Sequence, residues 1–242
     1  MCSPELGCCC GACVLRESDL AEPWFRIAKA VALPPIKLWF NWRFEGLEEI
    51  PASGPAIVAC NHISYLDPLS NAYAIVKAGR RPRFLAKEEL FHIPLIGRAL
   101  TGARQIPVDR SRPDNPEPLT AARSAVVSGE VVIVYPEGTV TNDPGSLPMT
   151  GKTGAVRLSL STGVPVLPMA SWGSQAVWQK SGRGSLKFGR PIWTKIGEPI
   201  DLSEHGGDAD DREALRTMTN QVMSELRELV LDLRARYPAR WT

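Results

Sequence analysis

Three short polar clusters in this chain carry the side-chain types used for proton transfer and anion binding. The first is Asn61-His62-Ile-Ser-Tyr-Leu-Asp67. An imidazole titrates near neutral pH, so His62 can serve as a general base. A carboxylate at Asp67, across a turn, can bond one ring nitrogen and stabilise the imidazolium that forms, and the amide of Asn61 can brace the turn. By itself this pattern also fits a purely structural hydrogen bond.

The other two clusters each follow an apolar run. Asp109 and Arg110 come after Gln105-Ile-Pro-Val108, and the planar fork of Arg110 can hold a phosphate or pair with a nearby acid. Tyr135-Pro136-Glu137-Gly138-Thr139 follows the run Val131–Val134. Proline ends a central ladder and glycine allows a sharp turn, so Glu137 is expected at a strand end, where its carboxylate can accept a bond from a substrate hydroxyl.

Alternating strands and helices must position these clusters. The pattern predicts an α/β domain with a mostly parallel central sheet flanked by helices. Its longest element is a C-terminal helix over 212–237 with a buried apolar stripe. The expected strands are 55–60, 83–86, 105–108, 131–135, 165–171, 186–192 and 195–200, and the expected shorter helices are 68–78, 92–101, 119–128 and 153–162.

The N-terminal part divides into two segments before an expected domain over 44–242. Residues 1–19 are expected to be a disordered tail that contains Cys2, Cys8, Cys9, Cys10 and Cys13. Cys10-Gly-Ala-Cys13 leaves a soft-metal site open, but no second pair with zinc-finger spacing follows, so a loose terminus or a start codon assigned too early fits better. Cys60 is expected to be a small buried residue. With no signal-peptide pattern and no disulfide framework, a reducing, cytosolic compartment is expected.

Residues 20–43 form an amphipathic segment. Leu20, Trp24, Ile27 and Val31 fall on one helical face, and the sequence predicts that Pro34-Pro35 breaks the helix. The segment is either an in-plane membrane anchor or a helix packed on the domain's own core. No apolar run in the chain approaches the 18 or more residues that a spanning helix needs.

The formal charge of +2 conceals a local bias. Residues 80–112 hold eight Lys or Arg and three acids, and residues 144–197 hold seven Lys or Arg and no acid. The basic residues form no run and accompany no nucleic-acid signature, so we expect no nucleic-acid partner. A phosphorylated small molecule or an anionic membrane surface fits better.

The three clusters and a fourth segment resemble, in order and spacing over about residues 55–172, the blocks of the PlsC-type 1-acylglycerol-3-phosphate acyltransferases. Asn61, His62 and Asp67 match the block Asn-His-x-x-x-x-Asp. Asp109-Arg110 matches the second block and Tyr135–Thr139 the third, in which the family has Phe-Pro-Glu-Gly-Thr. Val164-Pro-Val-Leu-Pro168 matches the fourth.

The resemblance implies acyl transfer from a thioester, on acyl-CoA or acyl carrier protein, to the hydroxyl of 1-acylglycerol 3-phosphate. His62 is then the base oriented by Asp67, Arg110 binds the acceptor phosphate, and Glu137, with Gly138 and Thr139 beside it, binds the glycerol part. No metal or other cofactor is expected. The expected location is peripheral, at the cytoplasmic face of a membrane.

Position 140 departs from the family, because Val140 stands where many members have an arginine that helps to hold the phosphate. Lys152 is the first candidate to replace that charge, and Lys87 is the second.

Other functions remain open. The same transfer to glycerol 3-phosphate or another lipid alcohol would use the same blocks. A lipid-binding peripheral membrane protein without catalysis would not require His62 and Asp67 together. A thioesterase or phosphatase is a further alternative, although no nucleophilic Ser or Cys motif supports it.

Overall fold

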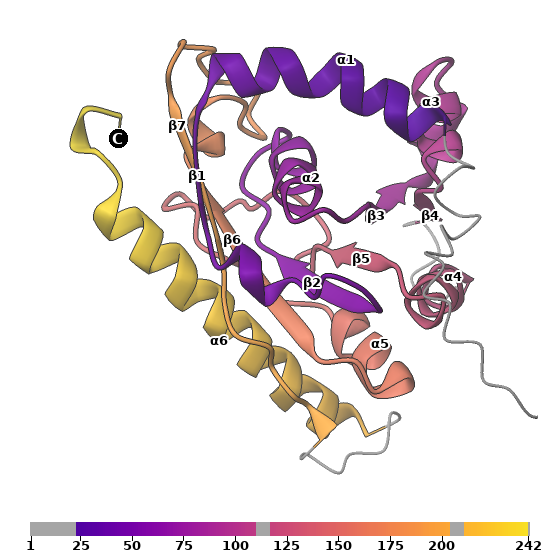
Figure 1. Ribbon diagram of the computed structural model, residues 1–242. Coiled ribbons are helices and arrows are strands. Elements are labelled where there is room, and N and C mark those ends of the chain that lie inside the picture. Colours follow the sequence, from indigo (N-terminus) through magenta and orange to yellow (C-terminus); the bar gives the residue numbers. More distant parts are fainter. Residues whose placement is uncertain (1–22, 110–116, 204–210, 242) are drawn as a thin grey trace, which may run out of the picture.

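The computed structural model describes residues 23–109, 117–203 and 211–241 (Figure 1). Within these ranges the chain forms one seven-stranded sheet in the order β1-β7-β6-β2-β5-β3-β4. β6 and β7 pair antiparallel and the other neighbours pair parallel. The predicted mostly parallel α/β architecture is confirmed. The strands are β1 Asn41–Glu45, β2 Ala56–Cys60, β3 Pro82–Lys87, β4 Ile106–Val108, β5 Val131–Val134, β6 Val166–Trp172 and β7 Pro191–Ile196.

Helices cover both faces of the sheet, as Figure 1 shows, with α2 on one face and α4, α5 and α6 on the other. Alternate residues of the central strands face opposite sides of the sheet. Ile57 and Ala59 pack in a cluster with α5 and α6, whereas Val58 and Cys60 pack with α2. The α-helices are α1 Pro23–Trp39, α2 Asp67–Lys77, α3 Ile96–Gly102, α4 Glu117–Val127, α5 Gly154–Thr162 and α6 Arg212–Arg236, and short 3-10 helices include η3 Glu88–His92 and η4 Ser174–Ala176.

Helix α1 lies outermost, crossing over α2 from the β1 side of the sheet to α3 (Figure 1). The prediction that Pro34-Pro35 ends this helix is wrong, because α1 continues to Trp39. Packing holds the last turns in place: Phe40 lies in a cluster with Ile192, and the Trp42 indole donates to the carbonyl of Ile36 (3.0 Å). These tertiary contacts outweigh the hydrogen bonds that proline removes.

Three further predictions needed correction. No strand covers 186–192; Gly189 has a φ of +74°, which interrupts an extended run, and β7 begins only at Pro191. The separate strand expected at 195–200 is the end of β7 plus a single bridge between Val166 and Ile200. The helix expected over 92–101 begins at Ile96, because Leu95 has a φ of +70°.

Residues 1–19 and Leu20 lie outside the described ranges, so the expectations for the cysteine-rich tail remain predictions. None of the helices in the described ranges is long and apolar enough to cross a bilayer.

Candidate active site

The candidate site lies where three neighbouring strands end. β2 pairs parallel with both β5 and β6, so their carboxyl ends meet at one edge of the sheet. Asn61 and His62 follow β2, Tyr135 to Gly138 follow β5, and Ser174 follows β6. The topology therefore brings the first and third polar clusters together, as an α/β sheet brings ligand-binding loops together.

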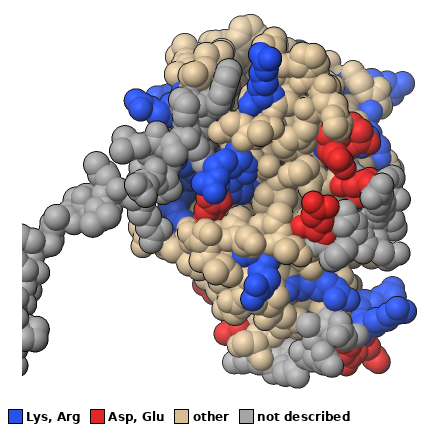
Figure 2. All heavy atoms as spheres, turned by 90° about the vertical axis from the view of Figure 1, so that its right-hand side faces the viewer, with Lys and Arg blue, Asp and Glu red and all other residues tan. Residues whose placement is uncertain are grey.

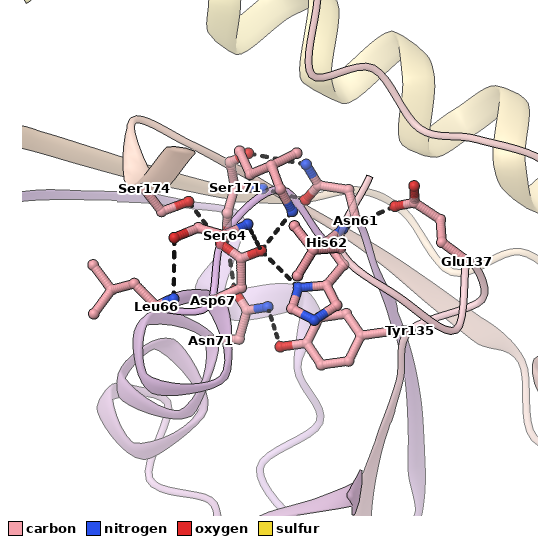
Figure 3. A network of polar contacts seen from close by, with 12 residues as sticks. Asn61, His62, Ser64, Leu66, Asp67, Asn71, Tyr135, Glu137, Ser171 and Ser174 are labelled. Carbon is pink, nitrogen blue, oxygen red and sulfur yellow. Dashed lines mark hydrogen bonds and ion pairs between the residues drawn. The ribbon is translucent and has the colours of Figure 1, made fainter. Parts of the chain in front are cut away.

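His62 and Asp67 form a hydrogen-bonded pair (Figure 3). Nδ1 of His62 lies 2.9 Å from Oδ2 of Asp67. A carboxylate only accepts, so we assign the proton to Nδ1, which leaves the lone pair on Nε2. The His62 side chain is 12% exposed and Asp67 is fully buried at the first turn of α2. The pair thus has the geometry of a base with its orienting carboxylate.

Three more donors hold the Asp67 carboxylate. Oδ2 also accepts from the backbone N–H groups of Ile63 (2.6 Å) and Ser64 (2.7 Å). Oδ1 accepts from the hydroxyl of Ser174 (2.6 Å). A buried charge is stable only where hydrogen bonds replace its hydration. These four donors satisfy the carboxylate and fix the direction in which it faces His62.

The Tyr135 ring stacks on the imidazole, with ring centroids 4.3 Å apart and planes at 25°. Its hydroxyl accepts a bond from the amide of Asn71 (3.0 Å), and the Asn71 carbonyl accepts from Ser171 (2.7 Å). Burial raises the pKa of Tyr135 well above its ordinary value, so the hydroxyl stays neutral. The imidazole is therefore restrained by a ring on one side and by Asp67 at Nδ1.

Asn61 braces strand ends. Its fully buried side-chain amide donates to the carbonyl of Ser171 (3.1 Å) and accepts from the N–H of the same residue (2.8 Å). This pair of bonds continues the β2–β6 ladder for one more step by means of a side chain. Asn61 thus fixes the point at which the chain leaves β2 and enters the His62 turn.

Glu137 is turned inward to the backbone. Its Oε1 accepts from the N–H of His62 (2.9 Å) and its Oε2 from the N–H of Met149 (3.0 Å), and the residue is 5% exposed. Burial raises the pKa of Glu137, and the two backbone bonds partly oppose that rise. The structure thus shows Glu137 bracing the backbone of His62. Its expected contact with the acceptor stays a prediction.

The glycine of the third cluster allows Lys152 to approach. Gly138 has a φ of +69°, and a Cβ built on it would lie 3.1 Å from Cε and Nζ of Lys152. The backbone N–H of Lys152 donates to the carbonyl of Pro136 (2.8 Å). The first candidate for the missing charge at position 140 therefore does lie against the third cluster.

The second cluster is only partly described. Arg110 lies outside the described residues, and its expected role stays a prediction. Asp109 follows β4, which is the edge strand and is separated from β2 by β3 and β5. Lys87, the second candidate for the missing charge, pairs with Glu89 (2.8 Å). That acid competes with any anion for Lys87.

Two residues that the sequence did not single out reach the site from the segment after β6: Ser174, which bonds Asp67, and Lys180. The ammonium of Lys180 lies 3.4 Å from the hydroxyl of Thr139 and 3.3 Å from the carbonyl of Val140. The only signal for Ser174 was its place three residues after the expected strand over 165–171. None existed for Lys180, whose position depends on how the following loop folds back.

Cys60 is buried, and burial raises the pKa of its thiol well above the ordinary value. It therefore packs as the small buried residue that the sequence predicted. No three His, Cys, Asp or Glu side chains of the described ranges come together as a metal ion would require.

Comparisons with known proteins agree with this arrangement. A family model described as Acyltransferase matches residues 41–172. The chain is 31% identical over 206 residues to the chloroplastic 1-acyl-sn-glycerol-3-phosphate acyltransferase of Arabidopsis thaliana, across 84% of this chain and 52% of the relative. It is 28% identical over 182 residues to the 1-acyl-sn-glycerol-3-phosphate acyltransferase of Bacillus subtilis, across 75% of this chain and 84% of the relative.

The chain spans about half the length of the first plant relatives, 52% and 51%. Among solved structures it is similar to the 1-acyl-sn-glycerophosphate acyltransferase PlsC of Thermotoga maritima, with a TM-score of 0.65 and 26% identity, across 93% of this chain and 86% of that one. The matched residues contain the His62–Asp67 pair and Glu137. The chain therefore belongs to the acyltransferase family, among the PlsC-type glycerolipid acyltransferases.

Proposed function

We propose that this chain transfers an acyl group from a thioester to the hydroxyl of 1-acylglycerol 3-phosphate, which gives phosphatidic acid. The observation that carries the proposal is the 2.9 Å contact between Nδ1 of His62 and Oδ2 of Asp67, which leaves Nε2 as the available base. The names of the Arabidopsis and Bacillus relatives and of the Thermotoga structure support this acceptor.

In the proposed reaction, Nε2 of His62 takes the proton of the acceptor hydroxyl as its oxygen attacks the thioester carbonyl carbon. The carbon–oxygen bond forms, and the carbonyl becomes a tetrahedral oxyanion. When that intermediate collapses, the carbon–sulfur bond breaks, and His62 returns the proton to the leaving thiolate. Asp67 faces the imidazolium that exists between these two steps and stabilises its charge.

Direct transfer, without an acyl-enzyme, is supported by the engagement of the serines near His62. The hydroxyl of Ser64 donates to the carbonyl of Trp178 (2.8 Å), that of Ser171 to Asn71, and that of Ser174 to Asp67. An activated serine nucleophile needs a hydrogen bond to its base. None of these three hydroxyls makes that bond to His62.

On the acceptor side, we propose that Lys152 and Arg110 hold the phosphate. Lys152 has an exposed ammonium beside Gly138. Glu137 acts by holding the N–H of His62 and, with Thr139, lies next to the glycerol part of the acceptor. Replacing Lys152 by Met should raise the KM for 1-acylglycerol 3-phosphate, and an unchanged KM would remove Lys152 from the phosphate site.

For the donor we propose acyl-CoA, with acyl carrier protein as the other thioester carrier to be compared. Assays with matched acyl chains on the two carriers separate them, because only the carrier differs. A higher kcat/KM with acyl-CoA is expected, and a clear preference for acyl carrier protein would contradict this choice of donor.

The substrate assignment is tested by following thiol release and lipid products with four acceptor conditions: 1-acylglycerol 3-phosphate, glycerol 3-phosphate, an unphosphorylated monoacylglycerol and no acceptor. We expect the highest kcat/KM with 1-acylglycerol 3-phosphate. A preference for glycerol 3-phosphate or for the unphosphorylated alcohol would identify that molecule as the acceptor instead. Release of free fatty acid without any acceptor would indicate a thioesterase. No turnover together with vesicle binding would favour the non-catalytic lipid-binding protein.

We propose further that α1 attaches the protein peripherally to the cytoplasmic face of a membrane. Val31 and Leu38 on α1 are 69% and 75% exposed, and Lys37 is exposed beside Leu38. Exposed apolar side chains with basic neighbours favour an interfacial helix. Replacing Val31 and Leu38 by Gln should weaken binding to anionic vesicles. The matched control is Val127→Gln on α4, a valine that is 67% exposed on the other side of the sheet. Equal binding by both proteins would contradict the anchor.

A further inference from the structure

Two exposed lysines flank the turn that follows β5. Lys152 lies across Gly138, and Lys180 lies over Thr139 and Val140. In the described part of the chain neither ammonium has a carboxylate partner. They differ in this from Lys195, which pairs with Asp232 (2.8 Å). Two uncompensated positive charges at one turn attract an anion.

The segment that carries Lys180 is held against the His62 turn. The carbonyl of Trp178 accepts bonds from the hydroxyl of Ser64 (2.8 Å) and from the N–H of Tyr65 (3.2 Å). The rings of Tyr65 and Trp178 are in edge contact, with centroids 5.5 Å apart. Lys180 is two residues beyond this attachment. Its position therefore follows from contacts with the same turn that carries the proposed base.

The other side of Lys180 is also tied to His62. Its ammonium donates to the carbonyl of Val140, and the next residue, Thr141, donates its N–H to the carbonyl of His62 (2.7 Å). Lys180 thus lies between the first and third clusters. Val140 itself is 3% exposed and apolar, so it offers no charge to a ligand at this point.

We propose that Lys180 binds the phosphate of the acyl acceptor and supplies the positive charge that position 140 lacks. This inference rests on the proposed function. In 1-acylglycerol 3-phosphate only two carbons and one oxygen separate the reacting hydroxyl from the phosphorus, so the phosphate must lie close to His62. An ammonium has three donors. Two of them reach Thr139 and Val140, and the third donor and the charge are available to phosphate.

Figure 2 shows that the Lys and Arg side chains on the α3–α4 side of the molecule lie in separate groups rather than in one continuous patch. The general basic bias of the chain therefore does not by itself select a phosphate site on that face. Selection comes from where individual charges lie, and Lys152 and Lys180 both lie against the third cluster.

The test is a kinetic comparison of the full chain with the variants Lys180→Met, Lys180→Arg and Lys187→Met. Lys187 is the matched control, because it is an exposed lysine of the same segment between β6 and β7. Loss of a charge-assisted contact should raise the KM for 1-acylglycerol 3-phosphate by about tenfold to a hundredfold in Lys180→Met. Its kcat should change less than its KM. Lys180→Arg should stay near the wild-type KM, and Lys187→Met should equal it.

A second acceptor separates phosphate binding from general damage. With an unphosphorylated monoacylglycerol, Lys180→Met should keep the wild-type KM, and its Tm should match that of Lys187→Met. An unchanged KM for 1-acylglycerol 3-phosphate in Lys180→Met would overturn the role of Lys180 and leave the proposed function intact. If the wild-type chain acylates only unphosphorylated alcohols, the proposed acceptor fails, and the role of Lys180 fails with it.

Discussion

The hydroxyl of Ser174 lies 2.6 Å from Oδ1 of Asp67, although 107 residues separate the two in sequence. This contact joins the segment after β6 to the turn after β2. It leaves Oδ2 of Asp67 to the His62 ring and to two backbone N–H groups. Ser174 is therefore a positioning residue that acts on His62 through Asp67.

Ser174→Ala should lower kcat by roughly tenfold and leave the KM of both substrates nearly unchanged, because the orienting carboxylate loses a charge-assisted bond worth about 1.5–3 kcal/mol. Ser159→Ala is the matched control, since Ser159 is also buried and donates to a carbonyl, that of Val164 (2.6 Å). Both variants should lose stability in urea unfolding. Equal kcat values in the two would reduce Ser174 to a structural contact.

Asp67→Asn should lower kcat by about a hundredfold or more, because a neutral amide no longer stabilises the imidazolium that forms on His62. Oδ2 of Asp67 accepts from His62 and from the N–H groups of Ile63 and Ser64. An asparagine that keeps its carbonyl at this position therefore turns its NH₂ toward Ser174 and offers His62 an acceptor without charge. Steady-state kinetics measures the loss, and circular dichroism checks the fold. A kcat within tenfold of wild type would contradict the pairing.

Tyr135→Phe should retain most of the activity and lose about 1–3 kcal/mol of stability, because the Asn71 amide loses its acceptor while the ring over His62 remains. Tyr135→Leu removes the ring as well and should lower kcat further. Comparing the kcat of the two variants isolates the ring contact. If the Phe and Leu variants have the same kcat, stacking on the imidazole does not matter.

Because the pKa of Glu137 is raised, the stability of the folded protein should depend on pH in a definite direction. Because burial is the largest cause, the folded state holds the proton of Glu137 more tightly than the unfolded chain does. Ionisation therefore costs stability as the pH rises above the ordinary value for glutamate, and that cost is complete above the raised value.

Glu137→Gln cannot ionise, so its stability relative to wild type should improve as the pH rises above the ordinary glutamate pKa of about 4.3. At every pH the variant also loses one of the two acceptors that hold His62 and Met149. Urea unfolding of both proteins at several pH values gives the difference directly. If the stability of Glu137→Gln relative to wild type falls as the pH rises, the pKa of Glu137 is not raised by burial.

Local sequence patterns were sufficient to predict those helices and strands whose own residues determine where they form. The continuous apolar runs at β2 and β5 predicted buried parallel strands, and the stripe containing Leu215, Val222 and Leu226 predicted α6. β2 and β5 are neighbours in the sheet, so the clusters that follow them lie at one edge. The contact between His62 and Asp67 could be expected, since both belong to one turn.

Contacts between residues far apart in the sequence could not be predicted from local patterns. The helix continues through Pro34-Pro35 because residues after them pack on β7, which lies more than 150 residues away in sequence. Lys180 reaches Val140 only because Trp178 is held by the His62 turn. The two backbone donors that hold Glu137, from His62 and Met149, come from other segments of the chain. No periodicity or spacing encodes contacts of this kind.

The role of His62 as the base is tested by the rate of thiol release from acyl-CoA with 1-acylglycerol 3-phosphate, compared between the wild-type chain and His62→Ala. We expect kcat to fall by about 10²–10⁴-fold, the range expected when a general base is removed, with vesicle binding retained. Wild-type turnover by His62→Ala would contradict the proposal that His62, held by Asp67, takes the proton of the acceptor.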